Sequence, residues 1–211
     1  MRQKLERSMD RTNTMNQRIK NLNRQTLSDK YFTLTEVKFD YQLENGNWVE
    51  NTWEVLERGN AAAALLYNVV KQTIILVKQF RLPAYMNGSD SGFLLEVPAG
   101  MLEDNDPDSE VAIKREILEE TGYSIPKLIK VYNAFATPGG STERFSCYVG
   151  EYKESMKINK GGGLDVENED IEVLEIPFSE AIKMIESGEI VDAKTILLLQ
   201  YAQINKIIVS A

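Results

Sequence analysis

Hydrophobic and polar residues alternate in patterns that predict strands over the first half of the chain and helices toward its end. Alternation over Phe32–Tyr41 and over Asn47–Val55, with the turn dipeptide Asn45-Gly46 between them, predicts an antiparallel hairpin. Further strands are predicted at Ala61–Tyr67, Thr73–Gln79, Leu94–Pro98, Lys127–Ala136, Glu143–Tyr152 and Ile171–Pro177. A helical period predicts helices at Ser109–Thr121, Phe178–Ser187 and Lys194–Asn205. This order indicates an α+β fold, or an α/β/α sandwich with a mixed sheet.

The predicted helices and loops carry finer expectations. Four apolar residues of the first helix are expected to face the core: Val111, Ile113, Ile117 and Leu118. Ser179 is the expected N-cap of the second helix. Tyr85–Gly92 is expected to be a polar loop, and Gly161–Gly163 is expected to open a mobile loop that ends at Asp170.

The composition narrows the chemistry that is available. The chain has 211 residues, which suits one domain with or without an appendage, and its formal charge of −8 argues against general affinity for nucleic acid or anionic membranes. It has no histidine, which excludes histidine-based nucleophile systems and histidine-ligated zinc or iron. The single cysteine, Cys147, is expected to be a buried, inert thiol. No apolar segment approaches the ~18 residues of a membrane span, so the cytoplasm is the expected location.

Positive charge gathers at the start of the chain. Residues 1–24 contain seven basic and two acidic residues, a net charge of +5. Because this segment is polar and poor in core residues, we expect a flexible arm. The arm could instead dock on the acidic remainder of its own or a partner subunit, or serve as an organelle-targeting segment.

The most informative segment is the acidic end of the first predicted helix. Glu116, Glu119 and Glu120 have the spacing that stacks side chains on one face of a helix, and Gly122 is a natural helix end. Like charges at this spacing repel, so a cation would stabilise them, and carboxylate oxygens suit Mg²⁺ or Mn²⁺. The alternative interpretation is an ordinary solvated acidic face.

The residues around this helix resemble the signature of the Nudix hydrolases. Gly100 opens the signature, and Arg115–Tyr123 (Arg-Glu-Ile-Leu-Glu-Glu-Thr-Gly-Tyr) closes it without a mismatch. Between them the chain has one residue more than the signature, and Asp106 or Pro107 stands where the signature has a glutamate. In such loops that acid has a mostly structural role, so the departure changes the loop more than the catalytic half.

The resemblance extends over about residues 27–205 and is strongest to the ADP-ribose and nucleotide-sugar branch, especially its GDP-mannose-cleaving members. It implies a Nudix-type α/β/α sandwich with a mixed sheet, preceded by an N-terminal antiparallel β-hairpin region. The expected divisions are a basic arm at 1–24, an N-terminal β region for dimerisation at 25–58 and the Nudix domain at 59–211. That branch forms homodimers with exchanged N-terminal strands, so we expect a homodimer with the strands around Phe32–Val55 at its interface.

The resemblance also implies roles for individual residues. The implied metal ligands are the Ala99 carbonyl, Glu116, Glu120 and Glu169, and the implied catalytic residues are Glu116, Glu119, Glu120 and Glu169. The positions that match substrate contacts are Tyr31, Glu54, Arg81, Gly100, Met101, Glu143 and Lys194. Thr52-Trp53 replace a Lys-Arg pair expected beside Glu54, so Trp53 could stack on a base or sugar but could not make the same ionic contact. Arg115 is expected to brace the acids.

Some of these residues have simpler explanations when taken alone. Arg81 could form a surface salt bridge, Tyr31 could pack within its sheet, and Glu169 could belong to an ordinary acidic loop. Beside the signature, we interpret all three as functional.

Together these expectations predict a Mg²⁺-dependent hydrolase, with Mn²⁺ as a substitute, that cleaves a nucleoside diphosphate sugar into a nucleoside monophosphate and a sugar 1-phosphate. GDP-mannose is the first candidate substrate. ADP-ribose, which would give AMP and ribose 5-phosphate, is the alternative within enzymes. A nucleotide-binding sensor without turnover is the alternative of another class, and the complete set of acids argues against it.

Overall fold

The computed structural model describes residues 18–164, 166 and 168–208, which divide into two compact units. The first unit comprises residues 18–58 together with the loop 137–143. The second comprises the other described residues, from 59–136 and from 144 onward. The loop joins the first unit because the backbone N–H of Leu56 donates to the Gly140 carbonyl at 2.8 Å and the Thr142 N–H donates to the Leu56 carbonyl at 3.1 Å.

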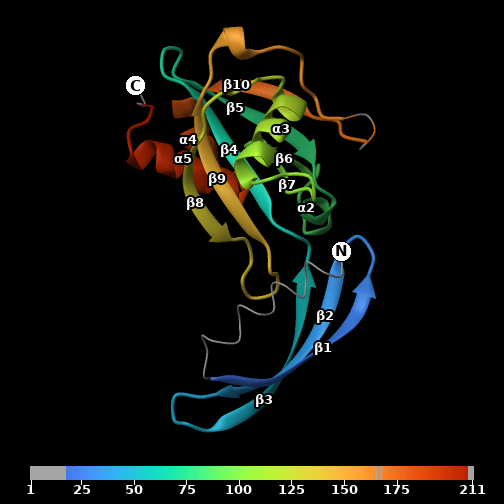
Figure 1. The fold of residues 1–211 in the computed structure, drawn as a ribbon. Helices are drawn as coiled ribbons and strands as arrows, with labels where there is room; N and C mark the ends of the chain where they lie inside the picture. Colours follow the sequence, from blue (N-terminus) through green and yellow to red (C-terminus); the bar gives the residue numbers. More distant parts are fainter. Residues whose placement is uncertain (1–17, 165, 167, 209–211) are drawn as a thin grey trace. The chain divides into compact units, whose positions relative to one another are not determined.

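An antiparallel sheet of three strands forms the first unit (Figure 1). Its strands, in spatial order, are β1 (Ile19–Asp29), β2 (Thr33–Gln42) and β3 (Trp48–Glu57). The predicted hairpin joins β2 and β3, and Gly46 in its turn has a φ of 87°, which residues with a Cβ rarely adopt. The alternating pattern therefore identified both strands of this hairpin.

Strand β1 differs from the flexible arm expected at residues 1–24. Ile19–Arg24 form the first half of β1, where Lys20 pairs with Asp40 and Arg24 pairs with Val37. Backbone pairing with β2 satisfies the N–H and C=O groups of this segment, so it forms a strand although it has few core residues. The rest of the predicted arm, residues 1–17, lies outside the described residues.

A mixed sheet of seven strands is the frame of the second unit (Figure 1). Its path is β10-β5-β4-β9-β8, with β6 paired to β5 and β7 paired to β4. The strands are β4 (Ala61–Asn68), β5 (Thr73–Phe80), β6 (Phe93–Glu96), β7 (Ala99–Met101), β8 (Ile129–Phe135), β9 (Arg144–Glu151) and β10 (Glu172–Pro177). β4 and β9 run parallel, and β4 and β5 run antiparallel. Ala62–Leu66 of β4 are completely buried, which explains their uninterrupted apolar sequence.

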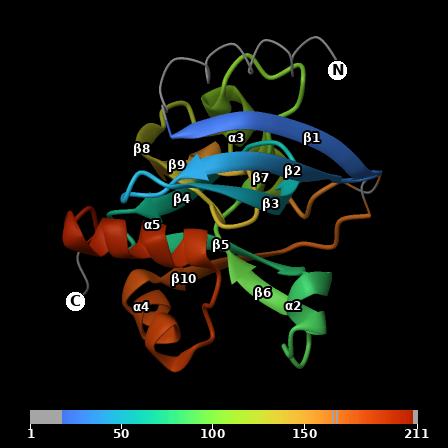
Figure 2. The same ribbon diagram turned by 90° about the horizontal axis from the view of Figure 1, so that it is seen from below.

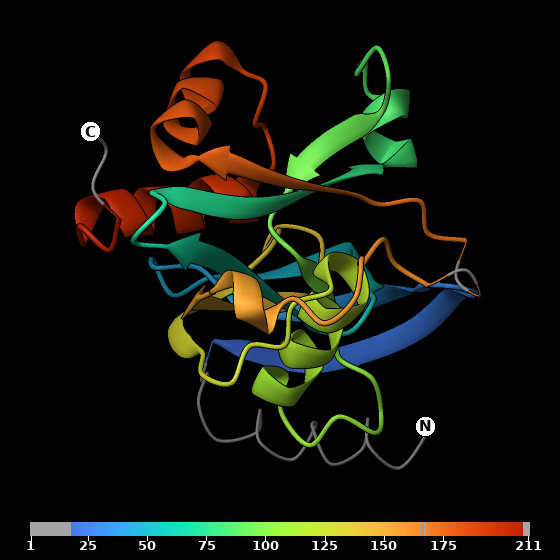
Figure 3. The same ribbon diagram turned by 90° about the horizontal axis from the view of Figure 1, so that it is seen from above.

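Helices cover both faces of this sheet (Figures 2 and 3). α3 (Ser109–Thr121) packs on one face through a core that includes Ile113 and Ile117. α4 (Phe178–Ser187) and α5 (Ala193–Ile204) pack on the other face through a separate core that includes Phe178 and Leu198. Two shorter helical segments are α2 (Leu82–Met86) and η1 (Glu154–Met156). The predicted α+β class, with an α/β/α sandwich and a mixed sheet, is confirmed.

Three local expectations are wrong. Val111 is 44 % exposed, because it lies roughly 200° around α3 from buried Ile113. The N-cap of α4 is Pro177, two residues before Ser179, because the first helical residue is Phe178, whose side chain is fully buried. The expected loop at Tyr85–Gly92 begins inside helix α2, which has a proline in its first turn, where a missing N–H costs little.

The single cysteine behaves as expected. Cys147 is completely buried in β9, and burial raises the pKa of its thiol to about 12. The thiol is therefore protonated and inert at neutral pH. Within the described ranges, no helix has the length and apolar character needed to cross a membrane.

Candidate active site

Helix α3 carries the acidic face that the sequence predicts. Asp108 caps its first turn, and Gly122 ends it in the left-handed conformation with a φ of 78°. The side chains of Glu116 and Glu119 are 14 % and 24 % exposed, and Glu120 is only 1 % exposed. This burial argues against an ordinary solvated face, because carboxylates are seldom buried without a partner.

The pKa values of two of these acids are raised, so both resist ionisation. Burial raises the pKa of Glu116 to about 7, against the opposing charge of Arg115. Burial, followed by the charge of Glu116, raises the pKa of Glu120 well above its ordinary value. The backbone N–H of Ala99 donates to Glu120 at 3.1 Å, which offsets only part of this effect. A bound cation would reverse the sign of these shifts.

Strand β7 brings its backbone against this acidic face. A Cβ atom on Gly100 would lie 1.9 Å from Cδ of Glu116 and 2.0 Å from its Oε1. The three nearest atoms to that position all belong to the Glu116 side chain. A side chain at residue 100 would therefore displace the Glu116 carboxylate from its position.

Arg115 braces the acids, as expected. Its Nη1 donates to Glu116 at 2.9 Å and to Glu119 at 3.1 Å, and its Nη2 donates to Asp106 at 3.2 Å. Asp106 also accepts from the N–H of Glu103 at 2.8 Å, and its side chain is 7 % exposed. The loop is one residue longer than the Nudix signature, yet Asp106 places a carboxylate on Arg115.

A glycine-rich loop docks against the C-terminal end of α3. The N–H of Gly162 donates to the Glu120 carbonyl at 2.8 Å, and the N–H of Gly163 donates to the Glu119 carbonyl at 3.1 Å. Further along, the Glu169 carboxylate accepts from the N–H of Leu164 at 3.0 Å. Residues 160–164 and 169–171 line a hollow of about 520 Å³. The loop thus brings Glu169 near the acidic face, where its charge raises the pKa values of Glu116 and Glu120.

The donor set fits a hard divalent cation. Glu116, Glu120 and Glu169 offer carboxylate oxygens, Ala99 offers a backbone carbonyl, and such oxygen donors are those that Mg²⁺ and Mn²⁺ prefer. As they stand, no three acidic, histidine or cysteine side chains of the described residues converge closely enough to hold an ion. Arg115 and the N–H groups of Ala99 and Leu164 occupy their oxygens instead. A cation at this site would exchange some of these bonds for its own.

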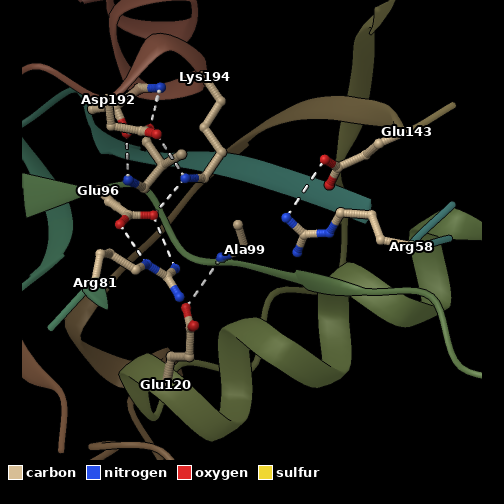
Figure 4. A network of polar contacts seen from close by, with 10 residues as sticks. Arg58, Arg81, Glu96, Ala99, Glu120, Glu143, Asp192 and Lys194 are labelled. Atoms are coloured by element: carbon tan, nitrogen blue, oxygen red, sulfur yellow. Dashed lines mark hydrogen bonds and ion pairs between the residues drawn. The ribbon is translucent and has the colours of Figure 1, made fainter. Parts of the chain in front are cut away.

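A second polar network lies beside Ala99 (Figure 4). Arg81 donates through Nε and Nη2 to the carboxylate of Glu96 at 2.7 and 3.0 Å, and the ammonium group of Lys194 also donates to this carboxylate. Lys194 further donates to Asp192 at 2.9 Å. The structure therefore brings together Arg81 and Lys194, two predicted substrate residues that are far apart in sequence. Sequence reasoning missed Glu96 and Asp192, although an acid within the apolar segment Leu94–Pro98 was a usable signal.

The other predicted substrate residues divide between the two units. Gly100 and Met101 belong to the second unit, where the Met101 carbonyl accepts from Arg115 at 3.4 Å. Three belong to the first unit: Tyr31, Glu54 and Glu143. There, Tyr31 is 83 % exposed, Glu54 is exposed, and Glu143 pairs with Arg58 at 3.6 Å. Trp53 is 55 % exposed and contacts Phe39 edge-on, with 5.7 Å between ring centroids.

Comparison with family models finds two matches along the chain. Residues 18–56 match the model described as GDP-mannose pyrophosphatase NudK N-terminal domain. Residues 57–199 match the NUDIX domain model. The second match contains the whole of α3 and the glycine-rich loop.

Comparison with individual proteins finds relatives along most of the chain. The GDP-mannose pyrophosphatase of Shigella dysenteriae serotype 1 (strain Sd197) is 44 % identical over 194 residues, covering 92 % of this chain and 100 % of the relative. That of Pectobacterium atrosepticum is 51 % identical over 179 residues, covering 85 % and 91 %. A crystal structure described as an ADP compounds hydrolase superposes with a TM-score of 0.65 at 20 % identity, covering 87 % and 91 %, and shows the same fold.

Proposed function

The chain belongs to the Nudix hydrolase family, and from this premise we propose that it cleaves GDP-mannose between its two phosphates. Members of this family hydrolyse pyrophosphate bonds with the help of divalent metal ions. Attack by water would yield GMP and mannose 1-phosphate. The observation that carries the proposal is 44 % identity to a GDP-mannose pyrophosphatase over that protein's entire length.

The chemistry of the substrate explains the architecture of the site. A pyrophosphate carries negative charge that repels a nucleophile, so cleavage needs charge neutralisation, an activated water and in-line positioning. Mg²⁺, with Mn²⁺ as a substitute, would neutralise the phosphates and lower the pKa of bound water. Glu116, Glu120, Glu169 and the Ala99 carbonyl would hold the ion. The burial of Glu116 and Glu120 supports this assignment, because it strengthens their interaction with a cation.

The remaining acids and cations have distinct proposed roles. Glu119, which Arg115 orients, and Glu169 would position the attacking water through hydrogen bonds to its protons. Arg81 and Lys194 would bind phosphate oxygens, since a guanidinium and an ammonium group both donate to phosphate. In the first unit, Tyr31 would stack on the base.

A substrate panel tests this function. The wild type, assayed with Mg²⁺ by phosphatase-coupled phosphate release, should cleave GDP-mannose with a higher kcat/KM than ADP-ribose. Glu120→Gln should lower kcat by about a hundredfold or more, since it removes a ligand at the reacting centre. Glu110→Gln is the matched control, because Glu110 lies on the same helix and pairs only at the surface with Lys114 at 2.7 Å.

Each contrary outcome removes a different part of the proposal. A preference for ADP-ribose would refute GDP-mannose as the substrate. A kcat of Glu120→Gln equal to that of the wild type would refute the assignment of the active site. Binding of GDP-mannose without any turnover would instead identify a nucleotide sensor.

We further propose that the protein is a homodimer assembled through the strands around Phe32–Val55. The first unit supports this, because nearly every residue of β1 is exposed and the sheet leaves Leu22, Leu27 and Trp53 45–55 % exposed. A three-stranded sheet with so little buried surface gains stability from a partner. Sedimentation equilibrium should give twice the chain mass of 23.9 kDa. A monomer mass at assay concentrations would refute this assembly.

A further inference from the structure

Among the described residues, Glu96 is one of two acidic residues that are almost completely buried. Glu96 is 2 % exposed, compared with 1 % for Glu120. Burial alone would raise the pKa of Glu96, but the hydrogen bonds and charges of Arg81 and Lys194 hold it below its ordinary value. Glu96 is therefore ionised at neutral pH and bridges two cations from elements that are distant in sequence.

Lys194 is held by further contacts. Lys194 also donates to Asp192, and Asp192 caps α5 by accepting from the Thr195 N–H at 2.9 Å. The Thr195 hydroxyl oxygen in turn accepts from the N–H of Val97 at 2.8 Å. The start of α5 is thus attached to the segment that carries Glu96, so the Lys194 backbone has little freedom to move.

The same segment continues to the acidic face. Glu96 contacts the cations, Val97 holds α5, and three residues after Glu96 the N–H of Ala99 donates to Glu120. Figure 4 shows the guanidinium of Arg81 between the carboxylates of Glu96 and Glu120. The segment from Glu96 to Ala99 therefore sets the position of two cations relative to the acids of α3.

The contacts leave donors on both cations. Glu96 engages only Nε and Nη2 of Arg81, and Glu96 with Asp192 engages part of the Lys194 ammonium group. Guanidinium and ammonium groups carry more N–H donors than these bonds use. Without the carboxylate between them the two cations would repel each other. The negative charge of Glu120 already acts on Arg81, so Glu120 is an alternative partner for Arg81.

We propose that Glu96 is a positioning residue that holds Arg81 and Lys194 together, so that both donate to the same phosphate of the substrate. This inference rests on the proposed function and deepens it. Glu96 does not contact the substrate itself. It acts by keeping Arg81 away from Glu120 and by holding the two cations at a fixed separation.

Glu96→Gln tests the proposal, because the amide keeps the size but replaces one acceptor oxygen with an NH₂ group that cannot accept. KM for GDP-mannose should rise roughly ten- to a hundredfold, the range for one lost hydrogen bond between charged groups. The kcat value should change by less than about threefold, since the acids of α3 are untouched. Glu175→Gln is the matched control. Glu175 lies in β10 and, like Glu96, is a carboxylate with several partners, accepting from Lys71, Thr73 and Tyr152. It belongs to a different network, so its substitution should leave KM unchanged.

A double-mutant cycle separates positioning from a general structural effect. In the background Arg81→Met with Lys194→Met, adding Glu96→Gln should raise KM no further, because its two partners are gone. Full additivity, or an unchanged KM in Glu96→Gln alone, would overturn the proposal. Should Glu96→Gln not fold, Glu96→Asp serves in its place: its carboxylate is one methylene shorter and cannot span both cations, so KM should still rise.

Calorimetric binding of GDP in EDTA distinguishes this proposal from the proposed function. Wild-type protein that turns over no nucleotide sugar would refute the function. Even in that case, the affinities of the two variants for GDP would test the role of Glu96. Weaker binding of GDP by Glu96→Gln than by Glu175→Gln supports the positioning role, and equal binding refutes it.

Discussion

Gly100→Ala is expected to abolish most activity while leaving the fold intact. The added methyl group would lie 1.9 Å from Cδ of Glu116, so this carbon must retreat by about 1.5 Å to reach the 3.4 Å at which ordinary contact begins. Glu116 has little room to move, because its side chain is 14 % exposed and is bonded to Arg115 at 2.9 Å. A displacement of about 1 Å at a reacting centre costs on the order of a hundredfold in rate. We therefore expect kcat to fall by about a hundredfold or more.

The stability of Gly100→Ala should stay near that of the wild type. Gly100 has no positive φ, so alanine adopts its backbone conformation and restricts the unfolded chain, which stabilises by about 0.4–1 kcal/mol. The weakened contact between Glu116 and Arg115 destabilises the variant by about 1–3 kcal/mol. Moving Glu116 away from the other acids reduces their repulsion and offsets part of this loss. Gly139→Ala is the control, since a Cβ there meets no atom within 4 Å. Activity and urea denaturation of both variants separate the two effects.

A second variant shows whether the methyl group acts through Glu116. Glu116→Ala removes the three atoms that the methyl group would meet, Cγ, Cδ and Oε1, so in that background Gly100→Ala should cause little further loss. Wild-type kcat in Gly100→Ala would refute the steric reasoning. Independent, multiplied losses in the double variant would refute the role of Glu116 in it.

Three further predictions concern contacts around the site and in the sheet. Asp106→Asn weakens the hydrogen bond from Arg115, so it should lower the free energy of unfolding, measured in urea titrations, by about 1–2 kcal/mol. It should also lower kcat, and an unchanged kcat would argue that Arg115 does not brace the acids through Asp106. Gly163→Ala should lower kcat, because residue 163 has a φ of 83° and its Cβ would lie 2.6 Å from the Glu169 side chain. An unchanged kcat would show that the loop does not set the position of Glu169. Burial alone would raise the pKa of Glu175, but hydrogen bonds from Tyr152, Thr73 and Lys71 hold this pKa below its ordinary value. The ionised carboxylate therefore stabilises the fold above the pKa of the unfolded state, and this stabilisation is lost as the pH falls through the pKa of the folded state. Between pH 6 and pH 3 the melting temperature of the wild type should therefore fall further than that of Glu175→Gln.

The sequence pattern predicted the bounds of an element where its hydrophobic period and its terminal residues agree. The helices at Ser109–Thr121 and Phe178–Ser187 have the predicted bounds, and the Asn45-Gly46 hairpin joins the predicted strands. The pattern failed at the start of the chain, where Ile19–Arg24 form a strand. The reason is physical: β1 is held by backbone bonds to β2 more than by buried side chains, and a hydrophobic pattern does not report such pairing.

Contacts between distant residues were beyond sequence reasoning. Glu96 and Lys194 are 98 residues apart, and only the folded sheet and α5 bring them together. The alternatives Asp106 and Pro107 at the irregular position could not be separated by spacing. The structure selects Asp106, since its carboxylate reaches Arg115.

The glycines, more than the acids, make this acidic helix distinctive. Acids at the spacing of Glu116 and Glu120 occur on many solvated helices, and their repulsion would ordinarily keep such a face in water. Here β7 packs against the acidic face and the glycine-rich loop packs against the end of the helix, and each can do so only where side chains are absent. A Cβ on Gly100 would overlap Glu116, and a Cβ on Gly161 would lie 2.5 Å from the Glu120 carbonyl oxygen. Burial raises the pKa values of Glu116 and Glu120, so a cation would gain more here than at a solvated face.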